Sequence, residues 1–380
     1  MENGKCRIDF PFFVFAFSTM IIDWKNTNRV LVVRLRSIGD TVLATPSLIA
    51  LRRFLPEAQI DILLEDWVAP LLEDSDLIDN IISIPNKNSL PVNKDKMSAK
   101  DLSIIRLLRA WSLRKTKYDV AINLHGGTTA AFFVRVSGAR ARVGYNNYQY
   151  NFLYTHRAPD SSQFWQQEHV QSAEQQLALL GSVGVPVSDK PKSQLVVTES
   201  ARNSVENRLA KSKIQNPKSK IALVHPAAAF ASKQWATEKF AHVAEFLFDK
   251  GFSTVAIAAP GEGEVLENLK QNARVPIITF DDLTLPELTA LASRTELFVG
   301  NDSGIAHIAA AVNTACVVIF GSSNIHHWRP WTNAPNEIVY SGTDFGKLEN
   351  IKRITVENVI EAIEKVLSSK NSVDTTIVKS

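Results

Sequence analysis

Short apolar runs alternate regularly with amphipathic helical stretches in the second half of this chain, between residues 220 and 320. Strands are predicted at 220–224, 254–258, 276–279, 297–299 and 315–320, and helices at 237–248, 262–271, 285–292 and 303–311. A strand–helix series of this kind folds into a parallel sheet with helices on both faces. The alternation therefore predicts an α/β unit of the Rossmann type.

The first half shows a similar alternation. Its predicted strands cover 29–35, 59–64, 80–84, 118–124 and 140–143, and its predicted helices cover 41–54, 102–113, 128–136 and 168–180. A chain of 380 residues is too long for one typical core, so two domains are expected. We predict an N-terminal extension at 1–28, Rossmann-like domains at 29–190 and 191–350, and a C-terminal helix and tail at 351–380.

Composition narrows the class of protein. A net charge of +3 gives no reason to expect a nucleic-acid partner. The two cysteines, Cys6 and Cys316, exclude a disulfide framework and a cysteine-rich metal site, which fits a cytoplasmic protein. The apolar stretch 10–22 is too short to span a bilayer. It is a start-site artefact ahead of Met20, a disordered extension, a peripheral membrane contact or a signal peptide.

Two turns combine charged or polar side chains with glycine where a predicted strand ends. The first is Ser37-Ile38-Gly39-Asp40. Asp40 is either a helix cap or a general base that takes a proton from an attacking hydroxyl. The turn lacks the Gly-x-Gly-x-x-Gly fingerprint, which argues against a nicotinamide dehydrogenase.

The second turn is Asn301-Asp302-Ser303-Gly304, followed by His307 one helical turn later. The unpaired N–H groups at a helix start favour an anion, and Ser303 and Gly304 allow it to approach closely. The segment thus predicts a phosphate site. The structural alternatives are an N-cap role for Asp302 and a buried core position for His307.

Further candidates lie at other predicted turns. Lys233 could place a positive charge on a phosphate, or be a solvated surface lysine. Glu262 follows Ala259-Pro-Gly and could accept from a ribose hydroxyl, or simply favour a helix start. Arg135 and Arg142 could bind phosphate or carboxylate groups, or form a solvated face.

In these blocks the chain resembles glycosyltransferase family 9, the bacterial lipopolysaccharide heptosyltransferases. The resemblance covers about residues 29–345 and rests on four blocks in the same order: 37–40, 225–235, 259–262 and 301–307. It implies the GT-B fold, in which two Rossmann-like domains face each other across a cleft. It also implies transfer of heptose from ADP-heptose to the lipopolysaccharide inner core, with inversion and with neither a cofactor nor a required metal.

The resemblance also implies roles for individual residues. Asp40 corresponds to the catalytic aspartate and Lys233 to the lysine at the donor diphosphate. Glu262 corresponds to a glutamate near the nucleoside, and the helix start at Asp302, Ser303, Gly304 and His307 to the donor-binding segment. We assign Gly39, Arg135 and Arg142 to the acceptor. The chain departs from the family where small hydroxyl residues are usual, since Ala227, Ala228 and Ala229 stand there.

The sequence therefore predicts an inverting heptosyltransferase whose acceptor is a lipid A–Kdo or heptosylated core. The alternatives are a GT-B transferase that uses another nucleotide sugar and a non-catalytic sugar-nucleotide-binding protein. Because the acceptor is a lipid, we expect a cytoplasmic protein that is peripheral to the inner membrane. Helix 102–113, which is basic and amphipathic, and the apolar N-terminus are the candidate contacts.

Overall fold

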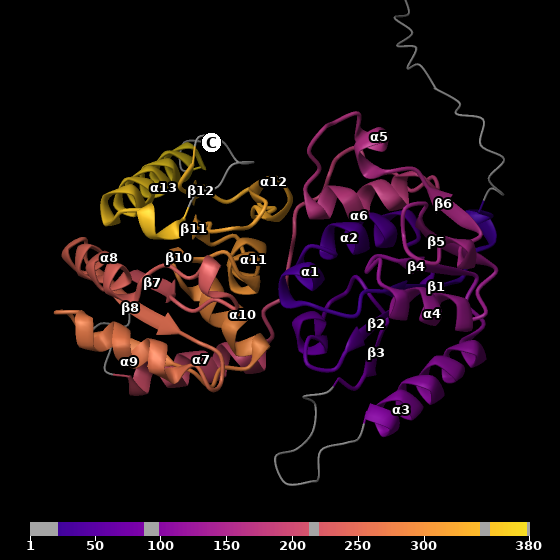
Figure 1. The fold of residues 1–380 in the computed structure, drawn as a ribbon, viewed down its shortest axis with the longest axis horizontal. Helices are drawn as coiled ribbons and strands as arrows, with labels where there is room; N and C mark the ends of the chain where they lie inside the picture. The colour runs from indigo at the N-terminus through magenta and orange to yellow at the C-terminus, as the bar shows by residue number, and fades with distance from the viewer. Residues whose placement is uncertain (1–21, 87–98, 213–219, 343–349, 378–380) are drawn as a thin grey trace, which may run out of the picture.

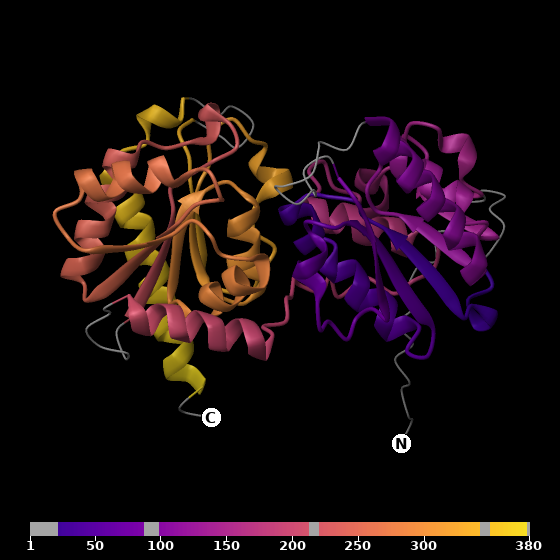
Figure 2. The same cartoon turned by 90° about the horizontal axis from the view of Figure 1, so that it is seen from below.

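The computed structural model describes residues 22–86, 99–212, 220–342 and 350–377, which form two α/β halves side by side (Figure 1). Each half is built on a six-stranded parallel sheet. Helices cover both faces of each sheet, as the view from below shows (Figure 2). This is the predicted fold class.

The N-terminal sheet has the strand order β3-β2-β1-β4-β5-β6. The chain therefore adds strands β2 and β3 on one side of β1 and strands β4 to β6 on the other, so the strand order reverses between β1 and β4. These two strands pair in parallel, with Val30 opposite Val120. The strands are β1 (Arg29–Val33), β2 (Gln59–Glu65), β3 (Asn80–Ile84), β4 (Val120–Asn123), β5 (Ala141–Tyr145) and β6 (His156–Ala158). The helices are α1 (Ile38–Val42), α2 (Thr45–Phe54), α3 (Ala99–Ser112), α4 (Thr128–Val136), α5 (Ser161–Trp165) and α6 (Ser172–Gly181).

The C-terminal sheet has the order β12-β11-β10-β7-β8-β9, so its reversal lies between β10 and β7. The strands are β7 (Lys220–His225), β8 (Phe252–Ile257), β9 (Ile277–Phe280), β10 (Leu297–Asn301), β11 (Ala315–Ile319) and β12 (Asn336–Val339). The helices are α7 (Glu199–Lys211), α8 (Thr237–Asp249), α9 (Gly263–Asn272), α10 (Leu285–Arg294), α11 (Gly304–Ala311), α12 (Ile325–Trp328) and α13 (Val356–Ile377).

The core explains why the strands are continuous apolar runs. In β1, Val30 and Val32 belong to one buried cluster, while Leu31 and Val33 belong to the cluster on the opposite face. Burial on both faces is what a parallel sheet with two helical layers requires. The first cluster also contains Ile308 of α11, so it extends into the C-terminal half.

Two helix predictions differ from the structure. The helix expected over 41–54 is divided into α1 and α2. Pro46 has no N–H for the carbonyl of Val42, which instead accepts from the hydroxyl of Thr45 at 2.7 Å. The helix expected from 168 begins only at Ser172, because the side chain of Gln171 caps it by accepting from the amide of Ala173 at 2.5 Å.

Further predictions concern the cysteines, the apolar N-terminal stretch, the linker and the C-terminal helix. Cys316 is buried in β11, as its apolar surroundings indicate, whereas Cys6 and the apolar stretch 10–22 lie outside the described residues, apart from Ile22. The segment between α6 and α7 contains no helix or strand, in agreement with a linker near residue 190. Helix α13 contacts α8, β11 and β12 of the C-terminal half. The exact domain boundaries stay a prediction.

Candidate active site

Four polar segments follow the two pairs of strands at which the sheets reverse. The turn with Asp40 follows β1 and His125 follows β4, whereas His225 ends β7 and Asn301 ends β10. In open parallel sheets, ligands bind in the crevice at the carboxyl ends of such strand pairs. The order of the strands therefore places the predicted turn with Asp40 and the unpredicted His125 at one such edge, and the predicted segments at His225 and Asn301 at the other.

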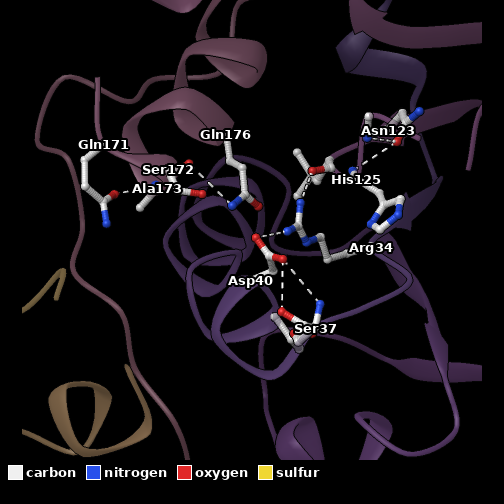
Figure 3. A network of polar contacts seen from close by, with 12 residues as sticks. Arg34, Ser37, Asp40, Asn123, His125, Gln171, Ser172, Ala173 and Gln176 are labelled. Atoms are coloured by element: carbon white, nitrogen blue, oxygen red, sulfur yellow. Dashed lines mark hydrogen bonds and ion pairs between the residues drawn. The ribbon is translucent and has the colours of Figure 1, made fainter. Parts of the chain in front are cut away.

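Asp40 is held by contacts to both of its carboxylate oxygens (Figure 3). Oδ1 forms an ion pair with the guanidinium of Arg34, a side chain that is 6% exposed. Oδ2 accepts from the hydroxyl of Ser37 at 3.1 Å and from its amide at 3.4 Å. Ser37 is thus the N-cap of α1, and Asp40 lies inside this helix as the acidic partner in its capping box, so the structural alternative is confirmed only in this form. The other oxygen is fixed by a buried cation.

The turn after β4 is organised by Asn123 (Figure 3). Its Oδ1 accepts from the amides of His125 at 3.0 Å and Gly126 at 2.9 Å. Burial, together with the charge of Arg34, lowers the pKa of His125 to about 4. At neutral pH this histidine is therefore uncharged beside the Arg34–Asp40 pair.

In the C-terminal half, Asn301 joins the turns after β7 and β10. Its Oδ1 accepts from the amide of Trp235 at 3.0 Å, and its Nδ2 donates to the carbonyl of Pro226 at 2.9 Å. Ser303 Oγ lies 3.2 Å from Nδ1 of His225, whose pKa burial lowers to about 4. Ser303 occupies the N-cap position of α11 but makes no side-chain cap bond, so the first amides of this helix lack the partner that a capping hydroxyl supplies.

Lys233 is not a solvated surface lysine. Its ammonium lies 2.9 Å from Oδ2 of Asp302, which also accepts from the hydroxyl of Ser323. Asp302 precedes the N-cap of α11, so it is not the cap itself. The pair holds one positive and one negative group next to the uncapped helix start.

The two halves touch where α1 meets α11. A Cβ atom on Gly304 would lie 2.7 Å from Cβ of Ile38 and 3.1 Å from the amide nitrogen of Gly39. A Cβ on Gly39 would lie 2.7 Å from Cδ2 of His307. A side chain at either position would push these neighbours apart, so the two glycines allow the turn that carries Asp40 to lie against the helix start at Ser303.

His307 is buried, as the structural alternative expected, but its ring is not fully hydrogen-bonded. Within the described residues its Nδ1 has no partner. Burial lowers the pKa of this histidine below its ordinary value, against the opposing charges of Asp302 and Asp40. His307 therefore provides an uncharged ring with a free nitrogen between the two halves.

A cavity of about 1310 Å³ lies between the halves and is lined by residues of both. His225, Ala258, Ala259, Pro260 and Ile305 line it from the C-terminal side. Its N-terminal wall includes Arg36, Ile38, Glu65, Trp67, Arg106, His125 and Thr128. This cavity is large enough for a nucleotide sugar, since ordinary ligand pockets measure about 300–1,000 Å³.

A second cavity of about 280 Å³ contains Asp40. Arg34, His125, Tyr148, Gln176 and Trp328 also line it, so His125 borders both cavities. Gln176 is 4% exposed, and its Oε1 has no partner in the described part of the chain. A hydroxyl group placed in this cavity would find both a carboxylate and an amide oxygen.

The remaining predicted residues lie further out. Glu262 occupies the N-cap position of α9, and its Oε2 accepts from the amide of Ala259 at 3.2 Å, on the rim of the large cavity. Arg142 donates to the carbonyls of Leu153 and Ala139, at 2.8 and 2.9 Å. Arg142 and the exposed Arg135 line neither cavity. Of the predicted site residues, only Asp40 lines one of the two cavities; the others line neither, namely Gly39, Lys233, Glu262, Asp302, Ser303, Gly304 and His307. The contacts of these residues with a donor or an acceptor stay predictions.

Sequence reasoning assigned no role to Arg34, His125 or Gln176. Arg34 directly follows β1, six residues before Asp40, and a cation at this place was the one available signal. In the described ranges, no cluster of three or more histidine, cysteine, aspartate or glutamate side chains is arranged to hold a metal ion.

Comparisons with known proteins agree with this arrangement. Residues 105–358, more than half of the chain, match glycosyltransferase family 9 (heptosyltransferase). Lipopolysaccharide heptosyltransferase 3 of Escherichia coli is 28% identical over 361 residues, which cover 89% of this chain and 99% of that protein. The protein of the same name from E. coli strain K12 is 29% identical over 352 residues, covering 88% and 96%.

Solved structures show the same fold. A family 9 glycosyl transferase from Veillonella parvula superposes with a TM-score of 0.79 at 20% identity, covering 92% of this chain and 99% of that one. E. coli ADP-heptose lps heptosyltransferase II gives a TM-score of 0.72 at 22% identity, covering 90% and 99%. The fold is GT-B, and the chain belongs to glycosyltransferase family 9.

Proposed function

We propose that this glycosyltransferase moves heptose from ADP-heptose to the inner core of lipopolysaccharide, with inversion at the anomeric carbon. The observation that carries the proposal is the contact between α1 and α11. On one side of this contact is Asp40, whose carboxylate is paired with the buried Arg34. On the other side is the start of α11, which has no side-chain cap and lies next to the Lys233–Asp302 pair. The choice of heptose as the sugar and lipopolysaccharide as the acceptor follows the names of the two E. coli relatives, 99% and 96% of whose length the alignments cover.

The donor diphosphate would bind at the start of α11. Amides at Ser303 and Gly304 would donate to phosphate oxygens, and Lys233 would add a charge-assisted bond. Backbone amides around Ala227–Ala229 would replace the missing hydroxyl side chains. His307 and Asp302 would stand beside the leaving group, and Glu262 near the ribose, at the rim formed by Ala259 and Pro260.

The acceptor hydroxyl would enter the small cavity beside Asp40, with the acceptor chain on the side of Gly39, Arg135 and Arg142. Asp40 would take the hydroxyl proton while the oxygen attacks the anomeric carbon from the face opposite ADP. The bond between that carbon and the phosphate oxygen breaks, and ADP leaves with the bonding electrons. Fixed dipoles and Lys233 stabilise the developing charge without need of a metal.

The place of action in this proposal is the cytoplasmic face of the inner membrane, because the acceptor is a lipid. Within the described residues, no helix is both long and apolar enough to cross a bilayer. A peripheral contact is therefore the form of membrane association that we propose.

The test is turnover by the purified protein with a heptose-deficient lipopolysaccharide core as acceptor. ADP-heptose would be compared with UDP- and GDP-sugars in the presence of a chelator. We expect ADP release with ADP-heptose alone. Preference for a UDP- or GDP-sugar would leave the fold and overturn the donor, whereas donor binding without turnover on any core acceptor would point to a binding protein.

A further inference from the structure

Helix α3 leaves an apolar face uncovered. Ile104, Leu107, Leu108 and Trp111 are 46%, 50%, 65% and 67% exposed. Their spacing of three and four residues puts them on one face of the helix. Single exposed apolar residues are common on protein surfaces, but four large ones on adjacent turns form a patch that marks a contact with another body.

The opposite face of α3 is already packed. Ala110 is fully buried, and Arg106 is ion-paired with Glu65 of β2 at 3.0 Å. Arg106 also donates to the carbonyl of Pro85 at 2.9 Å. The helix is therefore anchored to the N-terminal half by one side, and the exposed apolar side chains are not needed for that attachment.

Exposed cations lie near the C-terminal end of the patch. Arg109 lies on α3, and Arg114 and Lys115 follow in the turn that ends it; all three are exposed. Among the described residues, none of these three cations is paired with a carboxylate. An apolar stripe bordered by unpaired cations suits the boundary between acyl chains and anionic headgroups, where both kinds of group are satisfied together.

The position of α3 connects this face to the active site. Arg106 and Glu65 line the large cavity, so the same helix forms part of the cavity wall and carries the uncovered patch. Figure 1 shows α3 at the outer edge of the N-terminal half, away from the C-terminal half. A lipid could stay in the bilayer under α3 while its sugar enters the cavity.

We propose that the face formed by Ile104, Leu107, Leu108 and Trp111 docks this protein on an anionic lipid bilayer. The apolar side chains enter the acyl boundary, and Arg109, Arg114 and Lys115 contact the headgroup phosphates. The benefit of such docking rests on the proposed lipid acceptor, whereas the binding itself does not. A protein partner or a second copy of the chain is the competing occupant.

The test is sedimentation of the full chain with vesicles of phosphatidylglycerol and phosphatidylethanolamine, compared with vesicles of phosphatidylcholine. We expect binding to the anionic vesicles that weakens with salt. The double variant Leu108→Asp/Trp111→Asp should bind roughly tenfold less, since it removes apolar area and adds repelling charge. The matched control is Phe248→Asp, an exposed aromatic residue of α8 in the C-terminal half that is 49% exposed, which should bind as the parent does.

Three results would overturn the proposal: equal binding by the double variant, an equal loss in the control, or a variant that changes only the oligomeric state. A melting curve checks that the double variant is folded. Turnover on a lipid-free core saccharide separates this proposal from the proposed function. We expect the double variant to keep that activity and to lose activity on acceptor embedded in vesicles, whereas failure of all turnover in the parent would concern the proposed function alone.

Discussion

Arg34 forms an ion pair with Asp40 and, from the same guanidinium, donates to the carbonyl of Leu124 at 2.5 Å. One buried side chain therefore ties the turn after β1 to the turn after β4. Since a carboxylate that serves as a base must be held in one position, we propose Arg34 as a positioning residue for Asp40, the proposed base.

We expect Arg34→Met to lower kcat by about 10- to 100-fold while ADP binding changes little, because the base loses its fixed orientation. Arg34→Lys keeps the charge but has one nitrogen in place of the two that contact Asp40 and Leu124, so its activity should fall between that of the parent and that of Arg34→Met. The measurement is kcat, with the dissociation constant of ADP determined in parallel. A fully active Arg34→Met enzyme would remove this role.

Asp40→Asn tests the base itself. The amide oxygen can still accept from Ser37, so the cap of α1 should survive. Turnover should fall by about 10²- to 10⁴-fold, the range typical of a lost general base. ADP-heptose affinity, measured by calorimetry, should stay within a few-fold of the parent. Turnover at the parental rate would exclude Asp40 as the base.

Lys233→Ala is expected to weaken ADP binding by about tenfold or more, the loss of one charge-assisted bond to phosphate. Lys239 donates to the backbone carbonyls of Lys352 and Ile354, at 2.9 and 2.6 Å, and takes no part in the Lys233–Asp302 pair, so it provides a control lysine. Lys239→Ala should leave ADP affinity as it is. An unchanged ADP affinity in Lys233→Ala would withdraw its donor role.

Most of the fold could be predicted, because strands that are buried on both faces are continuous apolar runs in the sequence, such as 29–35. The short edge strands β6 and β12 were not predicted. They have three and four residues, and polar or partly exposed positions interrupt them. Local sequence carries little signal for such strands, since pairing with a neighbour defines them.

The site could be predicted only in part for a similar reason. Motif blocks indicated Asp40, Lys233 and the start of α11 as candidates, because each block is local. The contacts of Arg34 with Leu124 and of Gly39 with His307 join residues 90 and 268 positions apart, and the sheet order creates them. His125 carried no local signal, since its pKa depends on burial and on a distant arginine.

The contact of Gly39 with His307 can be tested by a double-mutant cycle. Gly39→Ala should destabilise the fold by about 1–3 kcal/mol, the usual cost of overpacking, because its Cβ would lie 2.7 Å from Cδ2 of His307. In a His307→Ala background the same change should cost clearly less. Urea unfolding of the four proteins measures the coupling, and equal costs in both backgrounds would show that the ring does not meet this glycine.

The last prediction concerns pH and His225, which is 7% exposed. Burial lowers its pKa to about 4, whereas an unfolded histidine titrates near pH 6.5. Between these values the unfolded chain binds more protons, so stability is complete above about pH 6.5 and falls as the pH drops towards 4. One such group contributes a slope of up to about 1.4 kcal/mol per pH unit.

We expect His225→Asn to have a shallower slope of unfolding free energy between pH 6.5 and 4. If this variant kept the parental slope, His225 would take up a proton as readily in the folded protein as in the unfolded chain, and its pKa would not be lowered by burial.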